Sequence, residues 1–410
     1  MSKTSLHDGT WHSVISRLGG LADLEATARE FKAFERRGKV TDAVSLLRLI
    51  LMYSVGHLSL RGTAAAFGPI ATLSDKAVEG RLRKSGDWLE HLLQCLLRSR
   101  VGDLATLGAL ALVDGSVIKP PGSGGQWRVH ARYDPARGGF ADLRLTPAGT
   151  AEATALTRLD AGQTVITDRG YARVRNFQAV LEAGSHVLTR IGWRSLALAD
   201  ETGRPFELFA KLPQGAAPVD YVVRLKGLAQ PFRLILQRLP QEKMANATKR
   251  ARRKSERNCS KIDPRTEQAA GYLMLLTSLP ARSAPPTRVV EMYRARWQVE
   301  LSFKRLKTLG GIDRLPSADP RLARTWLLAH LIVAVLNDEL AGQIVDSPPL
   351  SQSVIQRLSS HSGELGRWRD ASCYTPSCPS SFAATSNENI PLSINSPKHH
   401  DEENYNGGNS

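Results

Sequence analysis

One segment, Glu291–Gly310, carries a phenol, a carboxylate and two cations at regular spacing. These residues are Tyr293, Arg296, Glu300 and Lys307. The segment contains no proline and no glycine before its end, so it is predicted to form one helix. At about 100° per residue, the four side chains fall within one narrow arc beside an apolar stripe. Such a face could belong to a metal-dependent site, provided that further carboxylates converge on it.

The same spacing also fits a solvated helix face. Arg296 and Glu300 are four residues apart, which is the spacing of an ordinary intrahelical ion pair. Spacing within the helix therefore does not separate a structural role from a catalytic one, and the decision depends on residues elsewhere in the chain.

Two aspartates upstream follow apolar runs. Asp114 ends the run LGALALVDGS (107–116), and Asp168 ends QTVITDRGY. Each run is predicted to be a buried strand that terminates at its aspartate. In open α/β sheets, ligands bind at the carboxyl ends of the strands, so the two side chains could converge. Either aspartate alone could instead cap a turn.

Together with Glu300, the two aspartates would form a cluster of three carboxylates. Oxygen-only ligands of this kind select hard divalent cations, which makes Mg²⁺ or Mn²⁺ the expected ion.

The composition indicates a polyanionic partner. The chain has 410 residues, with 55 Lys plus Arg against 39 Asp plus Glu, a formal net charge of +16 and a pI near 10.0. Nucleic acid is the commonest such partner, and an anionic membrane surface is the alternative. No apolar stretch is long enough to span a bilayer and no signal-peptide core is evident, so a cytoplasmic protein is expected. The Cys373/Cys378 pair lacks the second half of a zinc site.

Residues 1–100 are expected to form a helical domain. Ser59 and Ser74 stand where helix N-caps are expected. The basic segment after Ser74 could be the second helix of a helix-turn-helix that binds DNA. A plain helical domain with a solvated basic face fits the same pattern.

The remaining chain alternates strands and helices, which predicts an α/β fold. Residues 192–284 interrupt this order with strand-like segments and a basic run of low hydrophobicity, predicted to be a loop. That run includes Lys249, Arg250, Arg252, Arg253 and Lys254. Residues 325–345 are strongly apolar and are predicted to form a buried helix that closes the fold. The Ser, Pro and Asn-rich tail, 346–410, is predicted to be disordered.

These residues resemble the DDE transposases of bacterial insertion sequences, in particular the IS-four group, whose signature is Y-x2-R-x3-E-x6-K. The signature is matched by Tyr293, Arg296, Glu300 and Lys307, with every gap preserved. The resemblance extends from about residue 46 to residue 340 and includes the VDGS, TDRGY and VLTRIGWR segments. The forty N-terminal residues and the tail depart from the family pattern. If the tail replaces a dimerisation surface, assembly of the paired-end complex is in doubt.

The resemblance implies a ribonuclease-H-like mixed sheet with flanking helices, formed by residues 101–191 plus 285–345 and interrupted by a β-rich insertion at 192–284. It also implies that Asp114, Asp168 and Glu300 bind two Mg²⁺ ions, with Mn²⁺ as a substitute. The activity implied is metal-dependent cleavage and strand transfer at the terminal inverted repeats of an insertion sequence.

The same resemblance assigns Tyr293, Arg296 and Lys307 to the DNA phosphates. Arg169 is a further candidate for DNA contact, as is the basic run. Trp297 could stack on an unpaired base, or it could pack against the core. The expected partners are double-stranded DNA and a second copy of the chain, in association with the nucleoid. An inactive DNA-binding relative and a general nuclease are the alternative functions.

Overall fold

The computed structural model describes residues 11–35, 38–99, 110–119, 127–308, 310–312 and 315–344. The predictions for the tail 346–410 and for the Cys373/Cys378 pair lie outside these residues. Within the described ranges, no helix combines the length and the apolar character needed to cross a bilayer.

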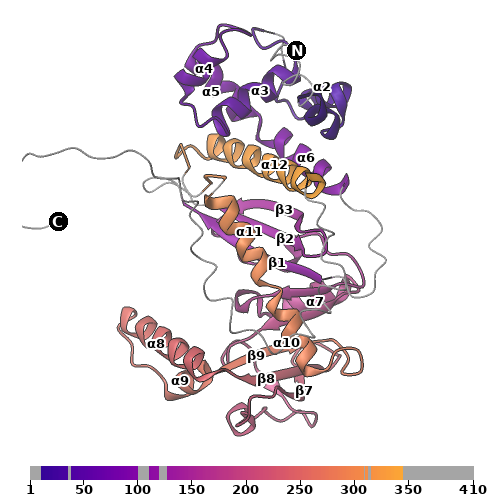
Figure 1. Ribbon diagram of the computed structural model, residues 1–410, viewed down its shortest axis with the longest axis vertical. Helices are drawn as coiled ribbons and strands as arrows, with labels where there is room; N and C mark the ends of the chain where they lie inside the picture. The colour runs from indigo at the N-terminus through magenta and orange to yellow at the C-terminus, as the bar shows by residue number, and fades with distance from the viewer. Residues whose placement is uncertain are drawn as a thin grey trace, which may run out of the picture. The chain divides into compact units, whose positions relative to one another are not determined.

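Helices fill the first part of the described chain, as predicted (Figure 1). Both predicted caps are confirmed. Ser59 Oγ accepts a hydrogen bond from the Gly62 N–H at 3.0 Å, and Ser74 Oγ accepts one from the Ala77 N–H at 3.2 Å. The helices are α2 (Gly20–Glu30), α3 (Ala43–Ser54), α4 (Leu60–Ala66), α5 (Asp75–Lys84) and α6 (Gly86–Ser99).

Nine strands form one mixed sheet in the part of the chain that the structure describes. Their order is β3-β2-β1-β4-β5-β9-β8-β7-β6. The pairs β1/β4 and β4/β5 are parallel, and the remaining pairs are antiparallel. The strands are β1 (Leu110–Ile118), β2 (Trp127–Asp134), β3 (Gly139–Pro147), β4 (Thr164–Thr167), β5 (His186–Arg190), β6 (Leu198–Ala199), β7 (Val219–Leu225), β8 (Phe232–Arg238) and β9 (Tyr272–Thr277).

The strands β6 to β9 come from the segment predicted to interrupt the core, and they extend the same sheet. β9 pairs with β5 on one side and with β8 on the other. The hydrogen-bonded sheet therefore continues without a break from β3 to β6.

Each face of the sheet supports its own apolar core, because successive residues of β1 point to opposite faces. Leu112 and Ile118 join the core that also contains α11 (Trp297–Thr308) and α12 (Pro320–Ile344). Ala111 and Val113 join the core formed with α7 (Val174–Glu182). Helix α11 thus covers the face to which the even-numbered residues of β1 point.

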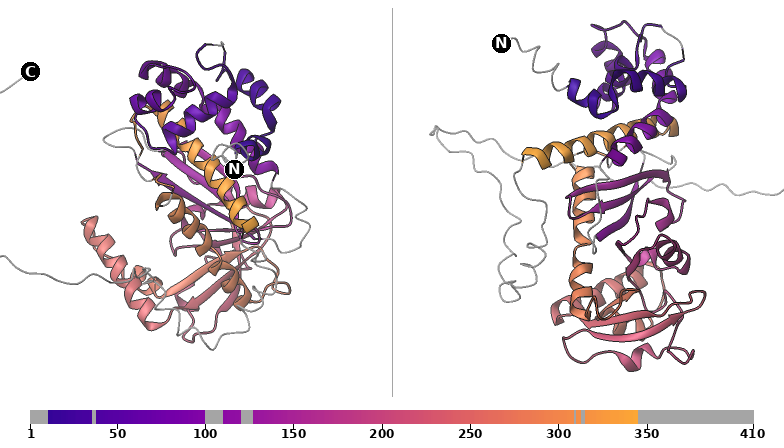
Figure 2. Two further views of the ribbon diagram at one scale, coloured as in Figure 1. Left: turned by 45° about the horizontal axis from the view of Figure 1, so that its top comes forward. Right: turned by 90° about the vertical axis from the view of Figure 1, so that its right-hand side faces the viewer.

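Helix α12 confirms the predicted closing helix and contacts both α6 and β3 (Figure 2). Thr325 Oγ1 donates to the Leu82 carbonyl at 2.7 Å, and Arg324 forms ion pairs with Asp87 and Glu90. The N-terminal helices are therefore attached to the sheet through α12 and also directly through α6, whose Gln94 Nε2 donates to the Leu143 carbonyl of β3 at 2.9 Å.

The prediction of one helix across residues 291–310 is wrong in one respect. The structure has α10 (Pro286–Arg294) followed by α11, with Ala295 and Arg296 in a turn between them. Around this turn the backbone hydrogen bonds join residues three apart, as in Arg296 N–H to the Tyr293 carbonyl at 3.1 Å. Such a local tightening redirects the chain without proline or glycine, which is why composition did not reveal it.

The basic run is a helix rather than the predicted loop. Helix α8 (Gln241–Arg257) is followed by α9 (Pro264–Ala270). Seventeen residues without proline or glycine, rich in Lys, Arg, Glu and Ala, have high helix propensity. None of these residues is buried, so packing contributes little to the stability of the helix. For the same reason the sequence shows no apolar stripe that would have indicated a helix.

Candidate active site

Asp114 lies within β1 rather than at its end, so that part of the prediction is wrong. The parallel pairing of β1 with β4 stops at Leu112↔Ile166, whereas the antiparallel pairing with β2 continues to Ile118↔Trp127. Residues 115–118 remain in the strand because their backbone pairs with β2 alone. Asp114 therefore lies where β4 ends and the sheet beside β1 opens.

Asp168 directly follows β4, as predicted. It also caps the short 3₁₀ turn η2 (Arg169–Tyr171), since its Oδ1 accepts a hydrogen bond from the Gly170 N–H at 2.7 Å. The capping alternative is thus correct, but it uses only one of the two carboxylate oxygens. Because β4 neighbours β1, Asp168 lies close enough to Asp114 for their charges to interact.

Glu300 approaches Asp114 from α11, and Arg296 connects the two carboxylates. The Arg296 Nη1 atom lies 3.4 Å from Asp114 Oδ2, and Nη2 forms an ion pair with Glu300. The i,i+4 ion pair expected of a plain helix face is therefore present. The same guanidinium also binds a strand 182 residues earlier, which a solvated helix face does not explain.

Asp114 is partly buried among charged groups that shift its pKa. The pKa of Asp114 is raised to about 6, mainly by burial and also by the Asp168 and Glu300 carboxylates, whereas the Gly115 N–H and Arg296 act to lower it. A cation placed among these groups would favour their ionised forms.

The donor chemistry of the cluster suits a hard divalent ion, since all three groups offer carboxylate oxygens. Within the described ranges, no three His, Cys, Asp or Glu side chains are already arranged around one metal position. Arg296 contacts both Asp114 and Glu300, and thereby supplies positive charge there.

The other signature residues differ in their surroundings. Tyr293 is largely buried, burial raises the pKa of its phenol, and its ring centroid lies 5.9 Å from the Arg296 guanidinium carbon. The Lys307 Nζ donates to the Val117 carbonyl at 3.2 Å, which places it along β1 beyond Asp114. The packing role considered for Trp297 is wrong, because 61% of this residue is exposed.

Two groups of predicted DNA contacts are exposed. Arg169 lies on η2 directly after Asp168. Lys249, Arg250, Arg253 and Lys254 are exposed on α8. Arg252 differs from these four, because it forms an ion pair with Glu267 of α9 and so connects the two helices.

The sequence did not single out three residues that lie near the aspartates, namely Glu152, its ion-pair partner Arg128, and Tyr171. Glu152 forms an ion pair with Arg128 at 3.4 Å, and its pKa is raised by burial and by Asp168. Tyr171 is fully buried, and burial followed by the charges of Asp114, Glu152 and Asp168 raises its pKa. Tyr171 could have been found from the sequence, because it belongs to the DRGY segment. Glu152 stands in an irregular loop, where neither periodicity nor spacing singles it out.

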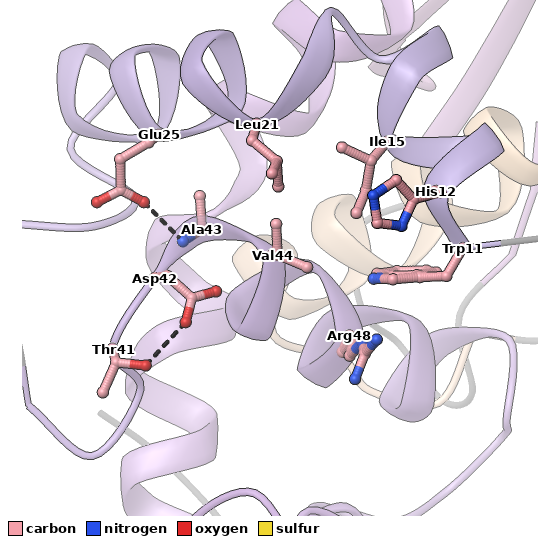
Figure 3. Close-up of a pocket in the computed structure, with 10 residues that line it drawn as sticks. All are labelled: Trp11, His12, Ile15, Leu21, Glu25, Thr41, Asp42, Ala43, Val44 and Arg48. Atoms are coloured by element: carbon pink, nitrogen blue, oxygen red, sulfur yellow. Dashed lines mark hydrogen bonds between the residues drawn. The ribbon is translucent and has the colours of Figure 1, made fainter. Parts of the chain in front are cut away.

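A pocket of about 570 Å³ lies among the N-terminal helices, away from the carboxylates (Figure 3). Its two acidic groups are engaged in backbone capping. Glu25 Oε2 accepts from the Ala43 N–H at 2.9 Å, and Asp42 Oδ1 accepts from the Ser45 N–H at 2.7 Å. The carboxylates that line this pocket therefore have structural roles.

The mixed sheet, with carboxylates converging where β1 and β4 separate, defines a candidate metal-dependent phosphoryl-transfer site. Residues 107–336 match the family described as the transposase DDE domain. The chain belongs to the DDE transposase family, whose members are enzymes that cleave DNA and transfer its strands. Membership implies a ribonuclease-H-like core and dependence on divalent metal.

Individual relatives extend the similarity over most of the chain. InsL of insertion sequence element IS186A, from Escherichia coli strain K12, is 34% identical over 360 residues, which cover 84% of this chain and 97% of that protein. The transposase for insertion sequence element IS421, from Escherichia coli, is 34% identical over 361 residues, with the same coverage of both chains. The transposase for IS231F, from Bacillus thuringiensis subsp. israelensis, is 21% identical over 361 residues, or 76% of each protein.

Proposed function

We propose that Asp114, Asp168 and Glu300 are the catalytic carboxylates of this DDE transposase and that they hold two Mg²⁺ ions, or Mn²⁺ in their place. The observation that carries this proposal is the Arg296 guanidinium, which contacts both Asp114 and Glu300. A strand and a helix far apart in the sequence thereby contribute two neighbouring carboxylates, and the charge of Asp168, which follows β4, acts on one of them, Asp114.

When bound, two divalent ions supply charge stabilisation for an in-line displacement at phosphorus. The chain's contribution is to hold three carboxylates on rigid elements at one opening of the sheet. Phosphodiester cleavage depends more on such positioning and electrostatics than on covalent help from the protein.

The cations and aromatic rings around the carboxylates are proposed to hold DNA. Arg296 offers a planar fork that can bind a phosphate through two parallel hydrogen bonds, whereas Lys307 acts as a point charge. Trp297 is exposed and can stack on an unpaired base. Tyr293 and Arg169 belong to the same set, as do four exposed cations of α8, Lys249, Arg250, Arg253 and Lys254.

The proposed substrates are the terminal inverted repeats of an insertion sequence and a target duplex. The names of the IS421 and IS231F relatives, each a transposase for an insertion sequence element, support this substrate. The helices of residues 1–100 are proposed to bind the repeat, a homodimer is proposed as the active assembly, and association with the nucleoid would follow from DNA binding.

The test is cleavage of a duplex that carries the inverted repeat flanking the gene, compared with a scrambled duplex, in Mg²⁺ and in EDTA. We expect Mg²⁺-dependent nicking at the repeat boundary of the cognate duplex alone. Equal cutting of both duplexes would indicate a general nuclease. Binding of the repeat without cleavage in Mg²⁺ would indicate an inactive relative.

A further inference from the structure

A fourth carboxylate, Glu152, lies beside Asp168 and has no place in the three-carboxylate account. It comes from the loop between β3 and the 3₁₀ turn η1 (Thr154–Leu156). Only 27% of its side chain is exposed, and Arg128 of β2 lies 3.4 Å from it. Glu152 is therefore partly buried next to another acid.

Gly115 and Gly170 have no side chains, and this absence leaves room for the side chain of Glu152. A Cβ added to Gly170 would overlap Glu152 Oε2 and would lie 3.1 Å from Asp168 Oδ1, so both carboxylates border the same point. A Cβ added to Gly115, next to Asp114, would lie 3.7 Å from Glu152 Cγ. Glu152 thus reaches between the segments that carry the two aspartates.

The charges of this region do not balance. Four carboxylates, those of Asp114, Glu152, Asp168 and Glu300, face two guanidinium groups in contact with them, those of Arg128 and Arg296. The charge of Arg173 also acts on Glu152 and lowers its pKa. The carboxylates still outnumber these cations, and partly buried acids in excess favour the binding of a further cation or a proton.

A buried hydroxyl points into the same place without a partner. Tyr171 is fully buried, and its Oη forms no hydrogen bond in the described structure. A Cβ on Gly115 would lie 3.3 Å from that Oη and 3.6 Å from Arg128 Cδ. A buried hydroxyl left unpaired is costly, so a group that can form a hydrogen bond with it, such as a water molecule bound to an ion, is expected at this position.

We propose that Glu152 is a fourth carboxylate of the divalent-ion site, acting beside Asp168 on the side of Tyr171 and Arg128. The proposal rests on the proposed function, since it assumes that Asp168 holds a divalent ion. Glu152 either ligates that ion directly or accepts hydrogen bonds from its water shell, and in both cases its charge raises the affinity for the ion.

The experiment measures Mn²⁺ binding to the full-length protein by calorimetric titration and by the spectroscopic signal of free Mn²⁺, without DNA. The variants are Glu152→Gln, which keeps the shape of the side chain, and Asp168→Asn. Glu182→Gln is the matched control, because Glu182 is exposed on α7 and bonds only to Gln178 among the described contacts. Thermal unfolding in EDTA reports whether each variant folds.

We expect Glu152→Gln to weaken Mn²⁺ binding by roughly 10- to 100-fold, the range typical of groups that support metal ligands. Its unfolding temperature in EDTA should equal or exceed that of the wild type, since a repulsive charge is removed. The control should bind Mn²⁺ as the wild type does.

Wild-type affinity in Glu152→Gln, together with weakened binding in Asp168→Asn, would overturn the role of Glu152 alone. Unchanged binding in both variants, or no binding by the wild type, would overturn the metal assignment of the proposed function as well. A Glu152→Gln variant that melts well below the wild type in EDTA would show a structural role and would also overturn the proposal.

Discussion

Arg296 donates a hydrogen bond to Asp114 across 182 residues of sequence, with Nη1 3.4 Å from Oδ2. The contact requires that the chain turn at Arg296, between α10 and α11, and that β1 extend past Asp114. The residues Arg296 and Glu300, whose spacing in the sequence fits an ordinary helix surface, therefore lie beside Asp114 in the candidate carboxylate site.

Arg296→Lys should abolish most of the cleavage while preserving the fold. Lysine keeps the charge but cannot contact Asp114 and Glu300 at once, and it cannot bind a phosphate through two parallel hydrogen bonds. We expect a loss of about 100-fold in the cleavage rate, comparable to removal of one transition-state donor. Single-turnover cleavage measures it. A rate within a factor of two of the wild type would contradict the assigned role.

Asp114→Asn should stabilise the metal-free protein near neutral pH. The pKa of Asp114 in the folded protein is raised to about 6, above that of the unfolded chain, which is about 3.9. As pH rises between these values, the unfolded chain loses its proton first, so stability falls and stays low above pH 6. The asparagine removes this cost, which is about 1 to 3 kcal/mol at pH 7.

The measurement is thermal unfolding of the wild type and Asp114→Asn in EDTA from pH 4 to pH 8. The difference in unfolding free energy should vanish near pH 4 and grow to a plateau above pH 6. Added Mg²⁺ should stabilise the wild type more than the variant. A variant that is less stable than the wild type at pH 7 in EDTA would contradict the account.

Replacing Lys249 and Arg253 of α8 with alanine should make DNA binding less sensitive to salt. The slope of log affinity against log salt should fall by about 0.9 for each duplex phosphate that the protein no longer neutralises. Arg252→Ala is the control on the same helix, since Arg252 is already paired with Glu267, and it should change the slope less. Filter binding between 50 and 200 mM salt, roughly the usual range for such assays, measures the slope. If the slope is unaltered, α8 does not bind phosphate.

Gly170→Ala should impair cleavage by displacing Glu152. The new Cβ would overlap Glu152 Oε2, so the carboxylate must move away from Asp168. Gly170 does not have a positive φ, so the backbone itself accepts alanine. Combining the substitution with Glu152→Ala should add little further loss, because both changes act on one contact. Fully additive losses in cleavage rate would show that the two positions act independently.

The sequence predicted those parts of the site that depend on local pattern. Asp168 could be placed at a strand end because an apolar run stops there, and Ser59 and Ser74 could be placed as caps. The extension of β1 could not be predicted, because it depends on hydrogen bonds to another strand, β2. The turn at Arg296 could not be predicted, because it is a local tightening without proline or glycine. Glu152 was missed because its position is set by contacts to other elements, namely Arg128 of β2 and the space beside Gly115 and Gly170.

We propose above that three carboxylates from separate elements act as one metal-dependent site. The most direct test of this proposal compares wild type, Asp114→Asn, Asp168→Asn and Glu300→Gln for binding and for Mg²⁺-dependent cleavage of the same inverted-repeat duplex. The account predicts that all three variants bind the duplex and that each cleaves at least about 1,000-fold more slowly than the wild type. Cleavage at the wild-type rate by any one of them would remove that residue from the site.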